Sequence, residues 1–212
     1  DASRKRVALA ELLVDLTRLR SEADHQIGPY GFDRAHDEIG ELLRNAPPKW
    51  GDLPEVQAAI AEVYSARGRA GFEAARTAYL RAIAEEDKAG RVPVKAIEQL
   101  ANLEARMAEW LCDRHNLSAS AFRRCVRETA LPRVRQAVSR LNHLIELSGD
   151  AEDKEPSAIP GQATRPNPER ESLLGSAYKI EAKLLADAGY AWSTVARTLK
   201  KAREAYRAAE DS

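Results

Sequence analysis

The hydrophobic residues of this chain recur at steps of three and four, the spacing that gathers side chains on one face of a helix. The first stripe predicts one long helix that Gly28-Pro29-Tyr30-Gly31 ends. Its members are Leu9, Leu12, Leu13, Leu16, Leu19, Ala23 and Ile27. A shorter second helix is closed by Pro47-Pro48 and Gly51, and its stripe contains Phe32, Ala35, Ile39, Leu42 and Leu43. We expect these two helices to pair as an antiparallel hairpin.

Two further pairs of helices follow. The first occupies residues 54–68, where Pro54 is a favourable first helical residue, and residues 72–90. The next begins after Pro93 and turns at His115-Asn116-Leu117, beyond which Ser118 is a candidate helix N-cap. Its first helix has as core candidates Ile97, Leu100, Leu103, Met107 and either Trp110 or Leu111.

The helix after Ser118 has the most regular stripe in the sequence, but Pro132 interrupts it. The stripe comprises Phe122, Val126, Ala130, Val134, Ala137, Val138, Leu141, Leu144 and Ile145. Proline lacks an amide donor and clashes with the carbonyl four residues back. We therefore expect a kink near Thr129, or two shorter helices that meet there.

Residues 149–167 break the helical pattern, because Pro, Gly and acidic residues replace the large apolar ones, and we expect a flexible loop. Periodicity resumes from Pro168, breaks at Gly189 and returns with Trp192, Val195, Leu199, Ala202, Tyr206 and Ala209. The predicted fold class is all-α, with consecutive antiparallel hairpins. Three hairpins form a block in residues 1–148, and a fourth in 168–212 packs on the block or caps it.

Composition narrows the function without naming one. Lys plus Arg and Asp plus Glu number 33 each, so no overall field favours nucleic acid or an anionic membrane. No stretch approaches the roughly 18 apolar residues of a membrane span, and the first residues lack the apolar region of a signal peptide. We expect a cytoplasmic protein. Because the chain begins with Asp1 rather than Met, we also expect a fragment of a longer protein or a processed product.

Cys112 and Cys125 are too few for a disulfide framework. Unpaired, buried cysteines in a reducing cytosol are the simpler interpretation, and a single bridge between them stays open. Their spacing with His115 matches no recognised zinc pattern, and only His143 is at hand as a further soft ligand. We expect no metal and no cofactor.

Other candidates for catalysis are equally poor. His36 beside Asp37 and His25 beside Asp24 suggest dyads, but neighbours on a helix point in different directions. No phosphate-binding glycine loop or dinucleotide fingerprint occurs in the sequence. We predict that the chain is not an enzyme, the alternative being a site inside the bundle where His, Cys and carboxylates converge.

The helix region 118–147 is locally basic, opposed there only by Glu128 and Glu146. The arginines are Arg123, Arg124, Arg127, Arg133, Arg135 and Arg140. Such a run is usually a solvated face, and the acids of residues 150–155 are available to pair with it. The alternative is a surface for nucleic acid or an acidic peptide. The absence of interleaved aromatic residues on that face argues against single-strand binding by stacking, and nucleic acid is not an expected partner.

Several positions match half-motifs of a known repeat. Leu174-Gly175-Ser176-Ala177-Tyr178 has the spacing Leu-Gly-x-x-Tyr. The spacing Ala-x-x-x-Tyr-x-x-Ala occurs twice, in Ala75, Tyr79 and Ala82 and again in Ala202, Tyr206 and Ala209. On these residues the chain resembles the tetratricopeptide repeat family, which implies a right-handed solenoid with Leu174, Gly175, Tyr178 and the two Ala-Tyr-Ala sets as packing residues.

The match to that family is incomplete. Its unit is about 34 residues, whereas the hairpins here average roughly 50. Ala61 stands where the family has glycine, and Glu104 stands where it has an aromatic residue. Residues 96–103 and 172–179 also resemble the repeat region of large bacterial proteins with a caspase-like CHAT peptidase domain, which implies a scaffold or sensor whose catalytic domain lies elsewhere.

In tetratricopeptide proteins the first helices of successive repeats line a groove for a partner's peptide or helix. The resemblance implies that Asn102, Arg106, Ser176 and Lys179 face such a groove, the alternative being an exposed polar surface. The predicted function is a protein–protein interaction scaffold that binds another protein or another domain of the parent chain. The alternative is a regulatory or sensor module of a larger bacterial protein with a separate caspase-like peptidase domain.

Overall fold

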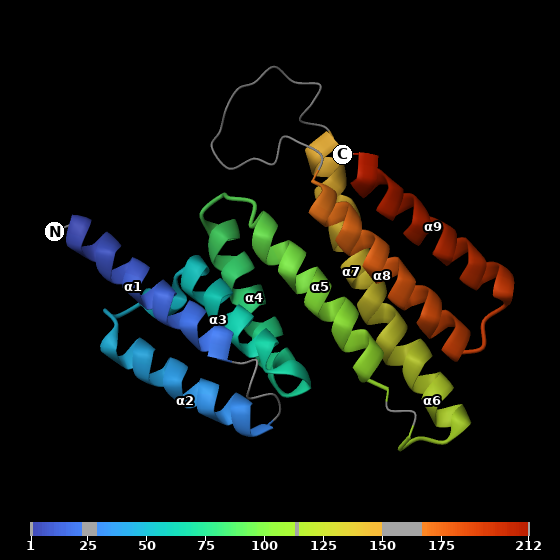
Figure 1. Cartoon of the computed structure of the whole chain (residues 1–212), viewed down its shortest axis with the longest axis horizontal. Helices are drawn as coiled ribbons and strands as arrows, with labels where there is room; N and C mark the ends of the chain where they lie inside the picture. The colour runs from blue at the N-terminus through green and yellow to red at the C-terminus, as the bar shows by residue number, and fades with distance from the viewer. Residues whose placement is uncertain (1, 23–28, 113–114, 150–166, 212) are drawn as a thin grey trace. The chain divides into compact units, whose positions relative to one another are not determined.

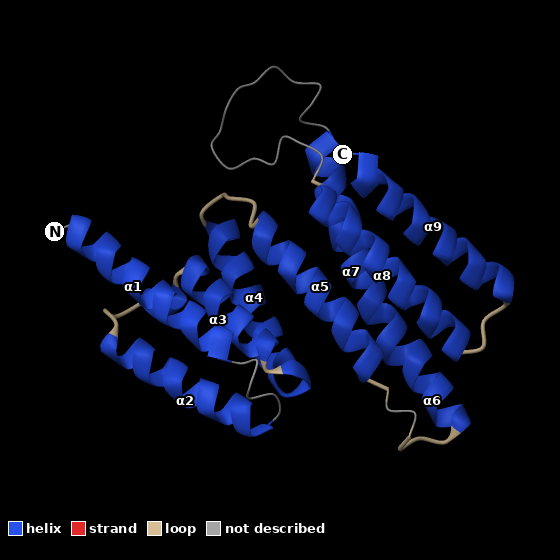
Figure 2. Ribbon diagram, viewed as in Figure 1, coloured by secondary structure: helices blue, strands red, loops and turns tan. Residues whose placement is uncertain are grey.

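The computed structural model describes residues 2–22, 29–112, 115–149 and 167–211. These residues form helices joined by short turns, and no strand occurs among them (Figure 2). The predicted all-α class is confirmed. The loop expected at 149–167 lies almost wholly outside the described residues, apart from Gly149 at the end of one helix and Asn167 just before the next.

The chain divides into two compact units, Asp1–Ala96 and Ile97–Ser212, with the boundary in the first turn of α5 (Val94–Trp110). Helices α8 (Pro168–Asp187) and α9 (Trp192–Asp211) belong to the second unit. The boundary therefore does not coincide with the segment 149–167. How the fourth hairpin packs on the first three stays a prediction.

The first unit is built from α1 (Ala2–Ser21), α2 (Pro29–Asn45), α3 (Pro54–Ala66) and α4 (Phe72–Lys88) (Figure 1). The most extensive contact joins α3 to α4, and α1 packs mainly on α3 rather than on α2. The core of this unit includes Leu12, Leu16, Leu19, Ala35, Ile39, Val56, Ile60, Val63, Phe72, Ala75, Tyr79 and Ala82. Helix α3 is thus the centre of the unit.

The break expected at Gly28-Pro29-Tyr30-Gly31 is misplaced. Helix α1 ends at Ser21, and Pro29, Tyr30 and Gly31 form the first turn of α2. Proline suits this position because its φ is already helical and the amide it lacks would have had no intrahelical partner. Ala23 and Ile27, expected on the first helix, lie outside the described residues.

Two glycines make the turn between α3 and α4 tight. Gly68 has a φ of 68°, in the left-handed region that favours glycine. A Cβ atom on Gly71 would lie 2.0 Å from the carbonyl oxygen of Tyr64, so no side chain fits there. The boundaries predicted at Pro54, Gly68 and Phe72 are confirmed, and α3 and α4 form a close antiparallel pair.

The second unit contains α5, the continuous run α6–η4–α7, α8 and α9, which point alternately in opposite directions (Figure 1). The run consists of α6 (Ala119–Cys125), the π-turn η4 (Val126–Ala130) and α7 (Leu131–Gly149). The core includes Ala101, Ala105, Phe122, Val126, Leu131, Val134, Leu141, Leu174, Leu184, Leu185 and Val195. Ser118 is the N-cap of α6, because its Oγ accepts a hydrogen bond from the amide of Ala121 at 3.3 Å.

The interruption expected at Pro132 is a π-turn. Residues Val126–Ala130 widen the helix by one residue, and the amide of Leu131 donates to the carbonyl of Val126, five positions back. The wider turn lets the chain pass Pro132, which cannot donate a hydrogen bond of its own. The two shorter helices expected near Thr129 are therefore confirmed.

Helices α8 and α9 approach closely because Gly175 has no side chain. A Cβ atom there would lie 3.0 Å from three ring carbons of Tyr206. The aromatic ring of one helix thus covers the glycine of the other. This is local packing, and the arrangement of the hairpins as a solenoid stays a prediction.

Three large residues of the predicted stripes are exposed. Leu199 is 41% exposed and Trp192 72%, so their place on a buried stripe is wrong. Of the alternatives Trp110 and Leu111, Trp110 is 42% exposed and Leu111 is the one that packs against the core. The buried face of α9 consists of smaller residues, Val195, Thr198, Ala202 and Ala205. Close approach to α8 favours small side chains on this face, and the larger ones turn outward.

Candidate protein-binding groove

The residues predicted to bind a partner lie on two helices of the second unit. Asn102 is half-buried and Arg106 exposed on α5, while Ser176 is half-buried and Lys179 exposed on α8. The Oγ of Ser176 hydrogen-bonds to the hydroxyl of Tyr206 at 2.9 Å and is therefore engaged within the unit. We refer to these four residues as the α5–α8 face. The structure shows where they are and leaves their binding role untested.

A cleft of about 510 Å³ lies in the first unit between α2, α3 and α4. We call it the α2–α4 groove. It is lined by Phe32, His36, Ile39, Gly40, Leu43, Gln57, Ile60, Tyr64, Glu73, Ala74, Thr77, Ala78 and Arg81. The α3 side chains among them are buried, whereas several on α2 and α4 are exposed. Helix α3 is thus the floor, α2 and α4 are the walls, and the groove opens to solvent.

The two walls run parallel to each other and antiparallel to the floor. Near one end of the floor, the hydroxyl of Tyr64 is 2.8 Å from Nδ1 of His36, in the first half of α2. At the other end, Gln57 donates to the carbonyl of Gly51, next to Leu43 near the end of α2. Because α4 returns along α3 after the tight turn, Glu73 lies at the Tyr64 end and Arg81 at the Gln57 end.

The Tyr64 end of the groove is aromatic. The ring centroids of Phe32 and Tyr64 are 5.4 Å apart, and those of His36 and Tyr64 are 6.1 Å apart. Burial raises the pKa of the Tyr64 hydroxyl above its usual value, so this phenol is neutral at physiological pH. Nδ1 of His36 and the hydroxyl of Tyr64 bond to each other, Tyr64 is buried, and Phe32 and His36 are the more exposed rings of this end.

The opposite end is basic. Arg81 and Arg44 are both exposed, and neither has an ion pair within the described ranges of the chain. Arg44 lies beside the groove, because a Cβ atom on Gly40 would be 3.4 Å from its Nη1. The groove therefore has two positive side chains, Arg44 and Arg81, at this end and the carboxylate of Glu73 at the aromatic end.

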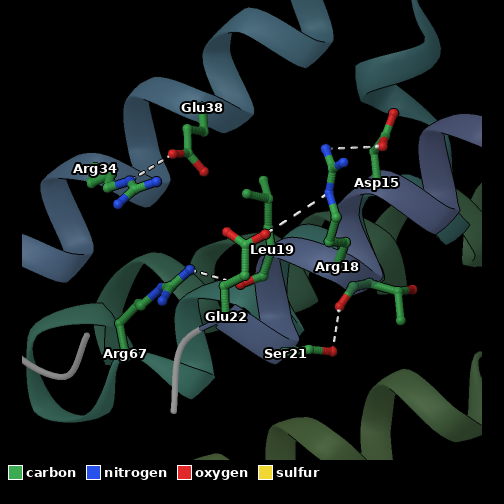
Figure 3. A network of polar contacts seen from close by, with 9 residues as sticks. Asp15, Arg18, Leu19, Ser21, Glu22, Arg34, Glu38 and Arg67 are labelled. Atoms are coloured by element: carbon green, nitrogen blue, oxygen red, sulfur yellow. Dashed lines mark hydrogen bonds and ion pairs between the residues drawn. The ribbon is translucent and has the colours of Figure 1, made fainter. Parts of the chain in front are cut away.

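A buried arginine that follows α3 forms a hydrogen bond to α1 (Figure 3). Arg67 is 2% exposed, and its Nη2 donates to the carbonyl of Leu19 at 2.7 Å. Nε and Nη1 of Arg67 have no hydrogen-bond partner among the described residues. Burial lowers the pKa of this guanidinium, and the carboxylates of Glu38 and Glu22 oppose the shift. The contact orients α1 without contributing to the groove surface.

Cys112 and Cys125 are joined in a disulfide, with their Cα atoms 5.8 Å apart. The interpretation as unpaired apolar cysteines is therefore wrong, and the bridge that the sequence left open is present. The chain after α5 turns back into α6 and brings the two residues together. Disulfides persist mainly in oxidising compartments. The two cysteines therefore no longer support the expected cytoplasmic location.

No group of three or more His, Cys, Asp or Glu side chains in the described ranges is placed to hold a metal ion. None of the described helices is both long and apolar enough to cross a membrane.

The arginines of α6 and α7 serve largely as internal contacts. Arg135 pairs with Glu181 of α8 at 2.9 Å, and Arg140 pairs with the buried Glu104 of α5. Arg127 donates to the carbonyl of Ala188 at 2.9 Å. Arg127 and Arg135 are nevertheless exposed, as expected of a solvated face, whereas the Arg140 side chain is only 21% exposed and departs from it. The acids at 150–155 that were expected to pair with them lie outside the described residues.

Comparisons with protein-family models, with curated proteins and with solved structures gave no match to this chain. The α2–α4 groove was missed by sequence reasoning because its lining comes from three helices whose pairing the periodicity did not specify. One signal was present: Gly40 and Ala74 are small residues on faces that also carry large apolar ones.

Proposed function

We propose that this chain is a non-enzymatic protein-interaction module that holds a segment of another protein, or of another domain of its parent chain, in the α2–α4 groove. The observation that carries the proposal is the form of that groove. Its floor is mostly apolar, with Ile60 and the ring of Tyr64 beside Gln57, its walls are two parallel helices, and it opens to solvent. An open apolar groove on a helical surface suits a partner that keeps its own polar face in water.

The groove also has the features of a preorganised receptor. The floor residues Ile60 and Tyr64 are buried in the core of the unit, and Tyr64 is fixed further by its hydrogen bond to His36. A rigid receptor lowers the conformational entropy that is lost on binding. Most of the conformational entropy lost on binding is then that of the partner segment, which folds on the surface of the groove.

The stacked, tetratricopeptide-like arrangement of hairpins is part of the proposal. The support for it is local: Gly175 packs on Tyr206, and Ala75, Tyr79 and Ala82 are buried together in the first unit. In this arrangement the α5–α8 face is a second surface available to a partner. We rank it below the α2–α4 groove, because Ser176 already bonds within the unit and Lys183 forms an ion pair with Glu109 across the two helices at 2.9 Å.

Photo-crosslinking from the groove tests this function. The chain carries p-benzoylphenylalanine in place of Thr77, a groove residue that is exposed. The crosslinked protein is identified, purified and titrated against the wild-type chain by calorimetry. We expect direct binding that Gly40→Leu abolishes, because the new side chain enters the groove, and that Asn102→Ala with Arg106→Ala and Lys179→Ala leaves unchanged.

Loss of binding in the triple variant alone would move the site to the α5–α8 face. Direct binding that neither variant weakens, or the absence of any directly binding protein, would contradict the proposal. Circular dichroism of each variant checks that a loss of binding is not a loss of fold.

A further inference from the structure

We infer that the occupant of the α2–α4 groove is an amphipathic helix that runs antiparallel to α2 and α4 and carries acidic side chains in its first turn. This inference rests on the proposed binding function of the groove and adds the chemistry and the direction of the partner. It follows from the length of the groove, from the state of its polar groups and from the charge at its two ends.

The dimensions of the walls suit a short helix. From Phe32 to Leu43 the α2 wall is about 16 Å long, and from Glu73 to Arg81 the α4 wall is about 12 Å long, at a rise of about 1.5 Å per residue. These lengths correspond to two or three helical turns. A partner strand would need an edge of free backbone amides and carbonyls, and helical walls offer none. A helix with apolar side chains on one face matches both conditions.

The small wall residues allow close approach. Gly40 on one wall and Ala74, Thr77 and Ala78 on the other line the groove, and a Cβ atom on Gly40 would meet only the tip of Arg44 within 4 Å. Small residues at an interface let two helical backbones come near each other. The partner's large apolar side chains then reach Ile60 and the aromatic rings at the Tyr64 end.

Most polar groups of the lining are already satisfied within the protein. His36 and Tyr64 bond to each other, Gln57 donates to the carbonyl of Gly51, and the hydroxyl of Thr77 donates to the carbonyl of Glu73 at 2.9 Å. We therefore expect the groove to bind mainly apolar side chains of the partner along its length. The exceptions are Arg81 of the lining and the neighbouring Arg44, which have no ion pair in the part of the chain that the structure describes.

The charges set the direction of the bound helix. Carboxylates are favourable in the first turn of a helix, where they also interact with the positive end of its dipole. Such a turn fits beside Arg44, near the end of α2, and Arg81, in the middle of α4. The bound helix then runs toward Glu73 and the aromatic end, so its dipole opposes those of both walls.

The volume alone also fits a small amphiphilic carboxylic acid, since small-molecule sites measure about 300–1,000 Å³. Such ligands are usually enclosed on most sides, whereas the walls of this groove carry the exposed side chains of His36, Thr77 and Arg81. The helix is the occupant that the open side favours, and the small amphiphile is an outcome of the test.

The test is a selection from a display library of helical peptides about 16 residues long, with an apolar face and with randomised first and last turns. The targets are the whole chain, the Gly40→Leu variant and the double variant Arg44→Glu with Arg81→Glu. The matched control is Lys5→Glu with Arg6→Glu, which makes the same charge change on an exposed part of α1 outside the groove.

We expect peptides with Asp or Glu in the first turn to be enriched by the wild-type chain and lost with Gly40→Leu. Their dissociation constants should rise by about tenfold or more in the Arg44→Glu, Arg81→Glu variant and stay within about twofold in the control. Peptides with Lys in the first turn should recover binding to that variant, which a misfolded protein would not allow.

Three results would overturn the inference. Groove-binding peptides without an acidic first turn, or with the acids in the last turn, would refute the charge and direction and leave the proposed function standing. The absence of any peptide sensitive to Gly40→Leu would refute both. Tight binding of dodecanoate, lost with Gly40→Leu, in the absence of binding peptides would assign the groove to a small amphiphile.

Discussion

Two helical glycines, Gly40 and Gly175, have opposite surroundings. Gly40 faces the open groove, while a Cβ atom on Gly175 would press on the ring of Tyr206 at 3.0 Å. Glycine inside a helix costs about 0.5–1 kcal/mol relative to alanine. We expect Gly40→Ala to raise the free energy of unfolding by about that amount, and Gly175→Leu to lower it by about 1–3 kcal/mol through overpacking.

Urea unfolding followed by circular dichroism measures both changes. Gly40→Leu, the variant that blocks the groove, should be at least as stable as the wild type. A destabilising Gly40→Ala would mean that this position is not open, and a neutral Gly175→Leu would mean that α8 and α9 are not in close contact.

Tyr64 makes stability depend on pH at the alkaline end. Burial raises the pKa of its hydroxyl in the folded state above the unfolded value of about 10. The folded chain therefore holds this proton more tightly than the unfolded chain does. The resulting stability is present below about pH 10 and is lost as the pH rises through the folded pKa.

We expect Tyr64→Phe to lose less stability than the wild type between about pH 9 and 11, as measured by unfolding at each pH. The other tyrosines and the lysines titrate in both proteins and cancel in the difference. Parallel pH profiles for the two proteins would contradict the burial of this hydroxyl.

At the scale of the elements, ion pairs connect α5 to two other helices of the second unit. Glu98 of α5 pairs with Arg170 of α8, and both side chains are nearly fully buried, at 8% and 5% exposure. Glu104 of α5 pairs with Arg140 of α7. Buried charge pairs add little net stability, but removing one partner is costly. The two pairs connect α5 to α7 and α8.

We expect Glu98→Ala to lower the free energy of unfolding by about 3–5 kcal/mol, because the guanidinium of Arg170 loses its carboxylate in a buried position. Glu98→Met combined with Arg170→Leu should recover most of that loss. The exposed pair Lys200 and Glu204 on α9 is the control, and Glu204→Ala should leave stability nearly unchanged. Equal effects of Glu98→Ala and Glu204→Ala would show that the first pair is not buried.

At the scale of the whole molecule, the chain has two compact units and a disulfide in one of them. The Cys112–Cys125 bridge closes a loop of 13 residues, which restricts the unfolded chain and contributes about 3 kcal/mol to stability. Because the bridge lies in the second unit, its loss should act there.

We expect a reductant to speed amide hydrogen exchange in α5 to α9 and to leave exchange in α1 to α4 unchanged, as read by mass spectrometry of peptide fragments. The double variant Cys112→Ala with Cys125→Ala should not respond to the reductant. Two free thiols in the oxidised protein, or equal acceleration in both units, would contradict this assignment.

Much of the secondary structure follows from local chemistry. The helix boundaries predicted at Pro54, Gly68 and Ser118 and the interruption predicted near Pro132 are present. Capping, left-handed turns and the missing proline amide act within a few residues, so the sequence shows them. Pro29 begins α2, whereas it was predicted at the end of the preceding helix. Proline occurs at both kinds of helix boundary, and the hydrophobic pattern around it does not distinguish them. The candidate residues on α5 and α8 came from a motif, and their binding role stays a prediction.

What the sequence determined by itself is the helical class, most helix boundaries and the small residues that permit close packing, since each depends on neighbours along the chain. The tertiary structure decided which helices meet. It placed α1 on α3, paired Cys112 with Cys125, turned Trp192 to solvent and assembled the α2–α4 groove from three helices. These features depend on contacts between residues far apart in sequence, and a hydrophobic stripe states only that a face is buried, not which partner covers it.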